Sequence, residues 1–392
     1  LPPLMQESER DCPGAIPFKD LLKRPSPSFP AADFSMDEEE LVLYTGGTTG
    51  LPKGAVHTHM NLLRCATFGY QIRDLGRDLS PCDSVLVFGP LGHIGAMSYG
   101  LLPSAVHGRT MVILARFDPK TALEAIKRYR IELFVGTVPV AKSLLAQPEF
   151  RACDFSSVKM WLTGEWMVWL TSDFASQWRE LTGNPLVKWG YGMTEIANVC
   201  INATRMGYEV PYKNQFMAGC VPPDSDFGLR IVDFETHEEL PFGHKGEIVI
   251  KSPGRCTYYW NKPKETAESL SPEGWFYSGD IGMLDEQGYL YWFGRKKYLI
   301  RVSGFQVSGG EIEMVGRQCP DIENIGVIGV SHPKKGQIPK AFIQLKAGST
   351  ADTGQIARWF KENIAAYKVP EVVIMDELPM TPKGSIDMKK LS

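Results

Sequence analysis

Residues 44–54 read Tyr-Thr-Gly-Gly-Thr-Thr-Gly-Leu-Pro-Lys-Gly and directly follow the apolar run Leu41-Val42-Leu43. Glycines let a backbone approach a ligand closely, and successive backbone N–H groups in such a loop form a concave anion site. The threonine hydroxyls and the lysine add donors and positive charge, which suits a polyphosphate. The loop is not a Walker A loop, because no Gly-Lys-Ser/Thr occurs at the required spacing. The candidate ligand-binding residues are Thr45, Gly46, Gly47, Thr48, Thr49, Gly50 and Lys53.

Strands and helices alternate around this loop from about residue 41 to residue 200. The apolar runs 84–88 and 111–114 predict buried strands, and 132–136 and 158–162 predict further strands. Asp118-Pro119 has the capping side chain and first-turn proline of a helix start. This alternation predicts an α/β fold with doubly wound, mostly parallel sheets. The helix after the loop is expected to share one apolar face made of Leu62, Leu63, Ala66 and Tyr70.

The pattern changes near residue 200, where the predicted strands 228–233, 246–251 and 288–293 have few helices between them. Beyond Gly294, Ser308-x-x-Glu311 is a capping-box sequence that predicts a short helix. Strands at 325–330 and 340–345 and a helix at 352–366 are expected to follow. We therefore predict an irregular segment at 1–40, an α/β region at 41–200, a small β subdomain at 201–294 and a small α+β C-terminal domain at 295–392.

Composition restricts the class of partner. The formal charge of −3 argues against nucleic-acid binding, which needs a basic surface. The eight cysteines are scattered and include no Cys-x-x-Cys pair, so we expect reduced thiols and a cytoplasmic protein. No apolar run approaches the ~20 residues of a transmembrane helix. We expect a small-molecule substrate, and a homodimer stays open.

The glycine-threonine loop resembles that of the adenylate-forming superfamily, which includes acyl-CoA synthetases, firefly luciferase and peptide-synthetase adenylation domains. Its form Tyr-Thr-Gly-Gly-Thr-Thr-Gly is most similar to that of fatty acyl-CoA ligases. The resemblance implies ATP, Mg²⁺ and coenzyme A as cofactors, with a carboxylic acid as the substrate. The family has many more residues before the loop than the 43 that precede Tyr44, so we expect the N-terminal part to be truncated.

Further segments match the family's motifs in order. Residues 189–195, Trp-Gly-Tyr-Gly-Met-Thr-Glu, are similar to Tyr-Gly-x-Thr-Glu, and residues 275–280 end in Ser-Gly-Asp like the family's ribose-binding motif. The family's next motif begins at Gly294-Arg295. The resemblance implies that Thr194 donates a hydrogen bond to phosphate and that Glu195 holds Mg²⁺. Tyr191, which is flanked by Gly190 and Gly192 in the nucleotide-binding segment, would stack on adenine. Asp280 would bind the ribose hydroxyls, and Arg295 would contact ribose or phosphate.

The resemblance also places a hinge at Lys297 and a thioester-forming loop at Gly304. The C-terminal motif departs from the family, because Ser385 stands where the family has its catalytic lysine. Lys383 lies two residues earlier, and strand alternation would put both side chains on one face. We therefore take Lys383 as the candidate catalytic lysine.

Four residues are candidates for the acyl pocket. Pro90-Leu91-Gly92-His93 matches the family's Pro-Leu-x-His segment, and Gly164-Glu165-Trp166 falls where the family has a loop of small residues. The pocket candidates are His93, Gly164, Trp166 and Trp189.

The predicted activity is ATP-dependent activation of a carboxylic acid to an acyl-adenylate, followed by thioester formation with coenzyme A. Three alternatives stay open: an amino-acid adenylation domain, a luciferase-like enzyme, and a nucleotide-binding protein of weak catalytic power. An amino-acid adenylation domain would carry a Phe-Asp-x-Ser segment, and this sequence has no such segment after His93. The last would account for Ser385 and the short N-terminal part.

Overall fold

Residues 33–45, 52–71, 82–164, 170–188, 190–202, 217–220, 227–380 and 386–391 are described by a computed structural model of the chain. Among them, five parallel strands form one sheet in the order β4-β3-β5-β6-β7. Counted along the chain this order is 2-1-3-4-5, a doubly wound topology in which the direction of winding reverses between β3 and β5. The strands are β3 (Ser84–Val87), β4 (Thr110–Ile113), β5 (Leu133–Thr137), β6 (Met160–Gly164) and β7 (Leu186–Lys188).

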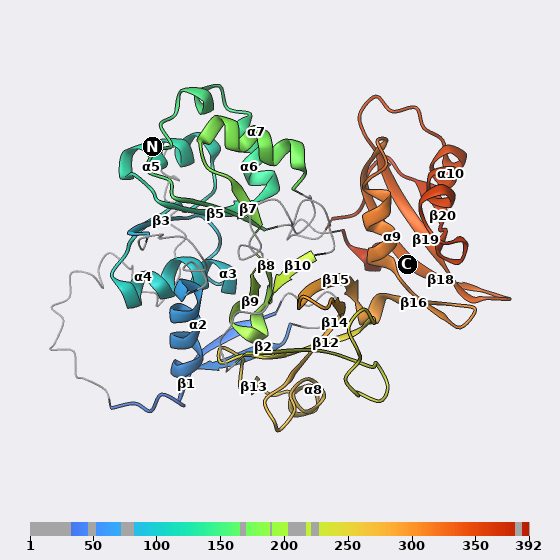
Figure 1. Ribbon diagram of the computed structural model, residues 1–392, viewed down its shortest axis with the longest axis horizontal. Coiled ribbons are helices and arrows are strands. Elements are labelled where there is room, and N and C mark those ends of the chain that lie inside the picture. The colour runs from blue at the N-terminus through green and yellow to red at the C-terminus, as the bar shows by residue number, and fades with distance from the viewer. Residues whose placement is uncertain are drawn as a thin grey trace, which may run out of the picture.

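Helices connect these strands and cover the sheet (Figure 1). They are α3 (Ile94–Ala96), a π-helical turn (Met97–Leu101), α4 (Leu102–His107), α5 (Pro119–Tyr129), α6 (Val138–Leu145), a 3₁₀ turn (Pro148–Ala152) and α7 (Ser172–Thr182). The predicted start of α5 is confirmed, because the Asp118 carboxylate accepts a hydrogen bond from the Thr121 backbone N–H at 2.8 Å. The carboxyl ends of β3 and β5 lie at the reversal point, the place where open α/β sheets bind ligands.

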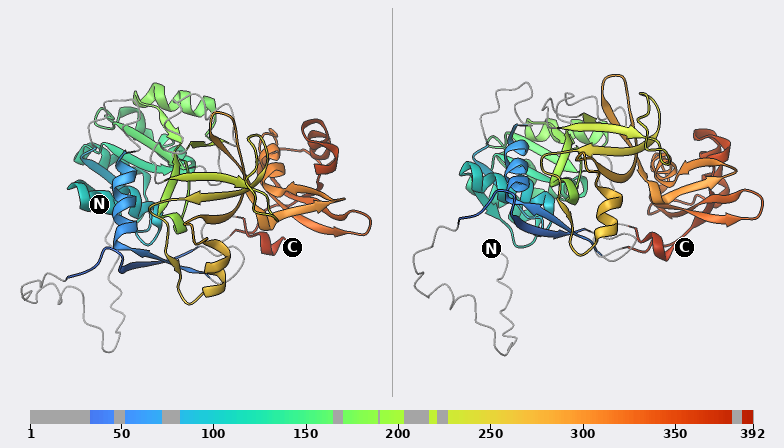
Figure 2. Two further views of the ribbon diagram at one scale, coloured as in Figure 1. Left: turned by 60° about the horizontal axis from the view of Figure 1, so that its bottom comes forward. Right: turned by 90° about the horizontal axis from the view of Figure 1, so that it is seen from below.

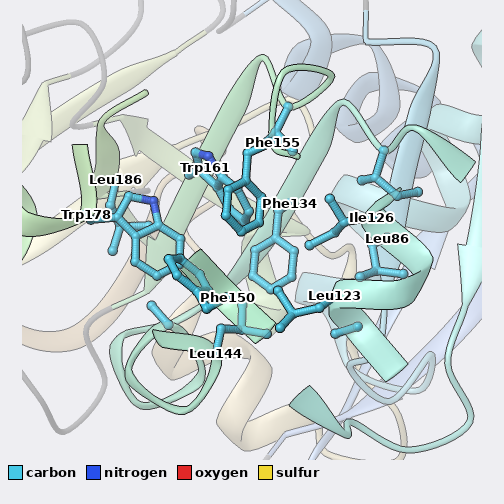
Figure 3. Packing of buried hydrophobic residues seen from close by; sticks show 14 of the residues in the cluster. Leu86, Leu123, Ile126, Phe134, Leu144, Phe150, Phe155, Trp161, Trp178 and Leu186 are labelled. Carbon is cyan, nitrogen blue, oxygen red and sulfur yellow. The ribbon is translucent and has the colours of Figure 1, made fainter. Parts of the chain in front are cut away.

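The largest hydrophobic core lies between one face of this sheet and α5, α6 and α7 (Figure 3). Trp161 and Trp178 are fully buried there and meet edge to face, with ring centroids 5.0 Å apart. Phe134 packs on Trp161 at 5.1 Å. This aromatic core fixes the strands whose ends carry candidate pocket residues.

The glycine-threonine loop connects two antiparallel strands, β1 (Glu39–Tyr44) and β2 (Gly54–Thr58). The expectation that the run before the loop starts the alternating strand–helix pattern was wrong, because β1 and β2 form a separate three-stranded sheet with β13 (Tyr258–Tyr259). Helix α2 (His59–Gln71) follows β2. In that helix Leu62 and Ala66 are buried as expected, but Leu63 is exposed.

A seven-stranded antiparallel sheet follows the parallel one. Its strand order is β11-β12-β14-β15-β10-β9-β8. Helix α8 (Pro263–Ser269) precedes β14, and a 3₁₀ turn (Thr194–Ile196) follows β8. The strands are β8 (Gly190–Met193), β9 (Asn198–Asn202), β10 (Met217–Cys220), β11 (Gly228–Val232), β12 (Gly246–Lys251), β14 (Phe276–Leu284) and β15 (Tyr289–Arg295).

Residues 296–380 and 386–391 form a smaller unit with its own core, which lies at one end of the molecule in Figures 1 and 2. Its strands are β16 (Leu299–Val302), β17 (Phe305–Ser308), β18 (Ile322–His332), β19 (Gly336–Leu345) and β20 (Glu371–Ile374). Its helices are α9 (Gly309–Gly316) and α10 (Thr353–Asn363), with 3₁₀ turns at Lys296–Tyr298, Ala366–Lys368 and Met388–Lys390. The α+β expectation for this region agrees with this arrangement.

Two local predictions need correction. Residues 111–114 were expected to be a buried strand, but β4 is an edge strand and Ile113 is exposed. Ser308 caps α9 through the Glu311 backbone N–H, whereas the Glu311 carboxylate binds Lys245 and Lys368 and does not complete the capping box. No helix in the part of the chain that the structure describes is both long and apolar enough to cross a bilayer.

Candidate active site

The base of the glycine-threonine loop is closed by two hydrogen bonds between Thr45 and Lys53. The Thr45 backbone N–H donates to the Lys53 carbonyl at 2.8 Å, and the Lys53 backbone N–H donates to Thr45 Oγ1 at 3.2 Å. Gly54 lies where β1 and β2 approach closely, since a Cβ there would be 2.8 Å from Val42 Cγ1. The loop therefore begins and ends on a fixed ladder. Its residues 46–51, with Gly46, Gly47, Thr48, Thr49 and Gly50, lie outside the described residues.

The Thr194–Glu195 turn is held by three neighbouring groups, two of which bind Glu195. Its carboxylate Oε1 accepts a hydrogen bond from the Tyr259 hydroxyl at 2.8 Å, and its backbone carbonyl accepts one from the Cys256 N–H at 2.7 Å. His57 Nε2 lies 3.0 Å from the carbonyl of Thr194. These bonds come from β2 and from the segment around β13, so the Thr194–Glu195 turn is fixed against the sheet that carries the loop.

Lys53 contacts the ring of the same tyrosine, Tyr259. Its Nζ lies 4.0 Å from the centroid of the Tyr259 ring, a cation–π distance. Tyr259 is buried and pairs with Ala55 across the β13–β2 ladder. The structure thus brings the predicted lysine and the predicted metal ligand to one tyrosine.

Asp280 forms a second cluster. Its Oδ2 accepts a hydrogen bond from the Tyr191 hydroxyl at 2.6 Å, and its Oδ1 lies 2.9 Å from Arg295 Nε. Arg295 also donates to the Ser278 carbonyl at 3.3 Å. Three residues predicted from separate motifs therefore meet at one buried carboxylate.

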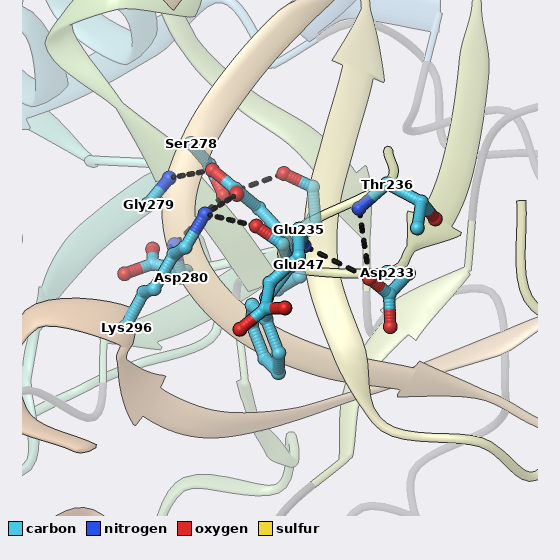
Figure 4. Close-up of polar contacts among 10 residues, drawn as sticks. Asp233, Glu235, Thr236, Glu247, Ser278, Gly279, Asp280 and Lys296 are labelled. Carbon is cyan, nitrogen blue, oxygen red and sulfur yellow. Dashed lines mark hydrogen bonds and ion pairs between the residues drawn. The ribbon is translucent and has the colours of Figure 1, made fainter. Parts of the chain in front are cut away.

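An ion pair between the buried Glu247 and the partly exposed Lys296 supports the backbone on which Asp280 lies (Figure 4). Glu247 Oε1 accepts a hydrogen bond from the Gly279 N–H at 3.0 Å, and Glu247 Oε2 lies 2.6 Å from Lys296 Nζ. Gly279 has φ of 69°, a left-handed conformation that favours glycine. The conformation before Asp280 is therefore set by residue type and by the Glu247 carboxylate.

Burial perturbs several of these groups. Burial raises the pKa of Asp280 even though Arg295 and Tyr191 favour its charged form. Burial and the Asp280 charge raise the pKa of Tyr191, so its hydroxyl stays a donor. Burial lowers the pKa of His57 to about 4, which keeps this imidazole neutral. Burial and the Arg295 charge lower the pKa of Lys297 to about 8.

The two clusters lie within electrostatic reach of each other. Burial is the larger effect on both groups, and it acts to raise the pKa of Asp280 and to lower that of Arg295. The Glu195 charge acts to raise both pKa values. The Lys53 charge helps to lower the pKa of Lys297. Residues from five distant segments thus converge, with two carboxylates placed among three cations.

The remaining candidates lie on other elements or outside the described part of the chain. His93 Nδ1 accepts a hydrogen bond from the Gly95 N–H at 3.1 Å, so His93 caps α3 after the end of β3. Gly164 is the last residue of β6. Gly304, with Ser303, forms the β16–β17 turn, and both have positive φ as in a type I′ turn. Trp166, Trp189, Lys383 and Ser385 lie outside the described residues.

Sequence reasoning missed the residues that position the site. His57, Tyr259 and Glu247 lie outside the motifs, and Lys296 lies within the Gly294-Arg295 motif but had no role assigned to it. The segment Gly-Glu-Ile-Val-Ile-Lys at 246–251 predicts the strand β12. It does not predict the ion pair of Glu247, because the partner Lys296 is distant in sequence.

The donor set fits magnesium bound together with a nucleotide. Among residues with described placement, no group of three or more His, Cys, Asp or Glu side chains could hold a metal alone. Mg²⁺ is commonly bound by one or two carboxylates that act with substrate phosphates and waters. A single fixed carboxylate such as Glu195 beside a polyphosphate loop matches that mode.

Known proteins similar to this chain have related sequences and folds. A long-chain-fatty-acid–CoA ligase of Bacillus subtilis (strain 168) is 34% identical over 354 residues, which cover 89% of this chain and 60% of that protein. A feruloyl-CoA synthase of Amycolatopsis sp is 33% identical over 93% of this chain and 73% of its own length. The solved structure of O-succinylbenzoate coenzyme A synthetase from Bacillus subtilis in complex with ATP and magnesium ion is 26% identical, with a TM-score of 0.80 over 95% of this chain and 74% of that chain.

Two family models match the chain. The model of the AMP-binding enzyme C-terminal domain matches residues 311–385. The model of the AMP-binding enzyme matches residues 7–260, well over half of the 392 residues, and the protein therefore belongs to the AMP-binding enzyme family.

Proposed function

We propose that this chain uses ATP to activate a carboxylic acid as an acyl-adenylate and then transfers the acyl group to coenzyme A, releasing pyrophosphate and AMP. The observation that supports this most is the convergence of Lys53, Glu195, Asp280 and Arg295 from separate segments. A loop lysine suits the triphosphate, a fixed carboxylate suits the metal, and a buried aspartate paired with an arginine suits the ribose of MgATP.

In the first step an oxygen of the substrate carboxylate attacks the α-phosphorus, and the bond to the pyrophosphate leaving group breaks. Lys53 and the N–H groups of the glycine-threonine loop would hold the leaving phosphates, and Tyr191 and Asp280 would orient the nucleoside. Glu195 would hold Mg²⁺, which supplies positive charge beside the phosphate oxygens when bound. The contribution of the protein is then positioning and charge stabilisation.

In the second step the coenzyme A thiol attacks the acyl carbonyl, and the bond to AMP breaks. We propose that residues 295–392 are a mobile domain that turns at Lys297 and brings the Gly304 turn to the site. Lys383 is the proposed lysine for the first step. The resemblance of motifs supports the assignments of Lys297 and Gly304, whereas that of Lys383 rests on strand alternation, which would place it on the same face as Ser385.

We propose a fatty acid as the substrate, with His93, Gly164, Trp166 and Trp189 around the acyl chain. The similarity to the Bacillus subtilis long-chain-fatty-acid–CoA ligase supports this choice. His93 follows the carboxyl end of β3 and Gly164 is the last residue of β6, at the sheet edge where ligands bind in doubly wound folds. The feruloyl-CoA synthase makes aromatic acids the competing class.

The test is carboxylate-dependent exchange of labelled pyrophosphate into ATP, followed by AMP release with and without coenzyme A, across fatty and aromatic acids. We expect exchange with fatty acids and AMP release that increases with coenzyme A. Glu195→Ala should abolish Mg²⁺-dependent exchange, and Glu268→Ala on exposed α8 is its matched control. Nucleotide binding without exchange for any acid would favour the nucleotide-binding protein that Ser385 suggests.

We propose a cytoplasmic location on the basis of the cysteines. Where side chains are described, Cys65, Cys153, Cys256 and Cys319 form no disulfide. Free thiols are typical of a reducing compartment. Measurement of the cellular fraction that holds the protein tests this assignment.

A further inference from the structure

We propose that Tyr259 is a positioning residue that holds the Glu195 carboxylate with its hydroxyl and the Lys53 ammonium with its ring face. The proposal rests on the proposed function, because it concerns the residues that would receive MgATP. Tyr259 belongs to none of the motifs that the sequence offered, and it lies between two charged residues that do.

The geometry of Tyr259 is fixed on several sides. The residue is 2% exposed, its backbone pairs with Ala55 in β2, and its N–H donates to Thr266 Oγ1 at 3.0 Å. A buried ring on a paired strand has little rotational freedom. The hydroxyl, 2.8 Å from Glu195 Oε1, therefore fixes the direction in which the carboxylate points.

One oxygen of Glu195 is thereby engaged, while a carboxylate offers further acceptor positions on its other oxygen. The Cys256 N–H already holds the Glu195 carbonyl at 2.7 Å. Backbone and side chain are both restrained before any ligand arrives. A carboxylate held in this way needs no reorganisation to receive a cation.

The ring face also gives the Lys53 ammonium a partner other than the Glu195 carboxylate. Unit charges 4 Å apart attract by about 4 kcal/mol near a protein surface, so a free lysine beside Glu195 would be drawn into an ion pair. In the described part of the chain Lys53 and Glu195 form no direct ion pair, and the Lys53 ammonium instead lies 4.0 Å from the ring centroid. The lysine stays available for phosphate and the carboxylate for a cation.

Two substitutions separate these roles. Tyr259→Phe removes the hydroxyl and keeps the ring, so we expect the Mg²⁺ concentration needed for half-maximal ATP binding to rise about tenfold, the effect of losing one hydrogen bond to a charged group. Tyr259→Leu removes both contacts, and we expect it also to lower the affinity for metal-free ATP more than that for AMP. Both are measured by titration calorimetry without an acid substrate, so that turnover plays no part.

Tyr258→Phe is the matched control, because Tyr258 lies on the other face of the same strand and its hydroxyl also donates to a carboxylate, that of Glu39. We expect it to leave Mg²⁺ dependence unchanged. The thermal midpoint without nucleotide is recorded for every variant, because a purely structural role would lower the midpoint and leave the Mg²⁺ dependence as in wild type.

The proposal is overturned if Tyr259→Phe retains the wild-type Mg²⁺ dependence of ATP binding. If Tyr259→Phe does not fold, Glu195→Asp provides the second test, since a shorter side chain moves the carboxylate away from the hydroxyl. An unchanged Mg²⁺ dependence in Glu195→Asp would equally contradict the proposal. A wild-type protein that binds no MgATP would instead contradict the proposed function itself.

Discussion

The hydroxyl of Tyr191 lies 2.6 Å from Oδ2 of Asp280 and joins two segments 89 residues apart. The same carboxylate lies 2.9 Å from Arg295 Nε on the neighbouring strand β15. An aromatic ring, a carboxylate and a guanidinium are thus held together before any ligand is present. Such a group can receive a nucleoside by stacking, hydrogen bonding and charge together.

Asp280→Asn keeps the shape of the side chain and removes its charge. We expect AMP to bind about 10- to 100-fold more weakly, because hydrogen bonds to a charged group are worth about 1.5–3 kcal/mol. Calorimetric titration with AMP measures the effect. Asp285→Asn is the matched control, since Asp285 also binds a tyrosine hydroxyl, that of Tyr291 at 2.9 Å, at the other end of the β14–β15 hairpin. An equal loss of AMP affinity in the two variants would show that Asp280 is not part of the nucleotide site.

His57 is expected to make the fold sensitive to acid. Burial lowers its pKa to about 4 from 6.5, so the unfolded chain binds a proton at higher pH than the folded chain. The stability contribution is therefore fully present above pH 6.5 and is lost as the pH falls toward 4, by up to about 3 kcal/mol.

Denaturant titrations between pH 7 and pH 4 test this expectation. His57→Gln keeps an amide donor for the Thr194 carbonyl and cannot protonate, so its stability should fall less steeply with acid. His244→Gln, at an exposed position before β12, should retain the wild-type slope. Parallel pH profiles for wild type and His57→Gln would show that His57 does not set the acid limit.

The sequence predicted the parts of the site that local pattern determines. Strand–helix alternation predicted the parallel sheet, and the Ser-Gly-Asp and Gly-Arg segments identified Asp280 and Arg295, which the structure places together. The sequence could not predict that the glycine-threonine loop joins antiparallel strands. A short apolar run such as β1 fits a strand of the parallel sheet as well as a strand of a separate antiparallel sheet. Tyr259 and His57 were missed because their roles arise only when β13 and β2 pair.

Lys297 is expected to cost stability at neutral pH. Burial, together with the Arg295 charge, lowers its pKa to about 8 from 10.5. The folded state therefore binds fewer protons than the unfolded chain between these values, and stability rises with pH across that window. Lys297→Met should raise the thermal midpoint below pH 8, with an advantage that shrinks toward pH 10. Lys361→Met on the exposed face of α10 should show no such pH dependence, and a pH-independent advantage for Lys297→Met would contradict the explanation.

Glu311 in α9 joins two sheets through its ion pairs. Its oxygens lie 3.1 Å from Lys245 Nζ, just before β12, and 2.6 Å from Lys368 Nζ. Burial opposes ionisation of this carboxyl, but the two lysines outweigh burial and lower the pKa of Glu311. Its contribution to stability is therefore present above the unfolded pKa, near 4.5, and is lost as the pH falls through the lower folded value.

Lys245→Met removes the ammonium that links the antiparallel sheet to α9, together with its cation–π contact 4.1 Å from the Phe293 ring centroid. Because Glu311 retains Lys368, we expect a loss of about 1 kcal/mol at pH 7 and faster amide exchange in α9. Lys264→Met is the matched control, since its ion pair with Glu268 at 3.9 Å is exposed and such pairs contribute about 0–1 kcal/mol. If the two variants change α9 exchange equally, the Lys245–Glu311 pair does not hold α9 against the sheet. If only Lys245→Met speeds amide exchange in α9, and its difference from wild type disappears as Glu311 is protonated, the linkage depends on the carboxylate charge.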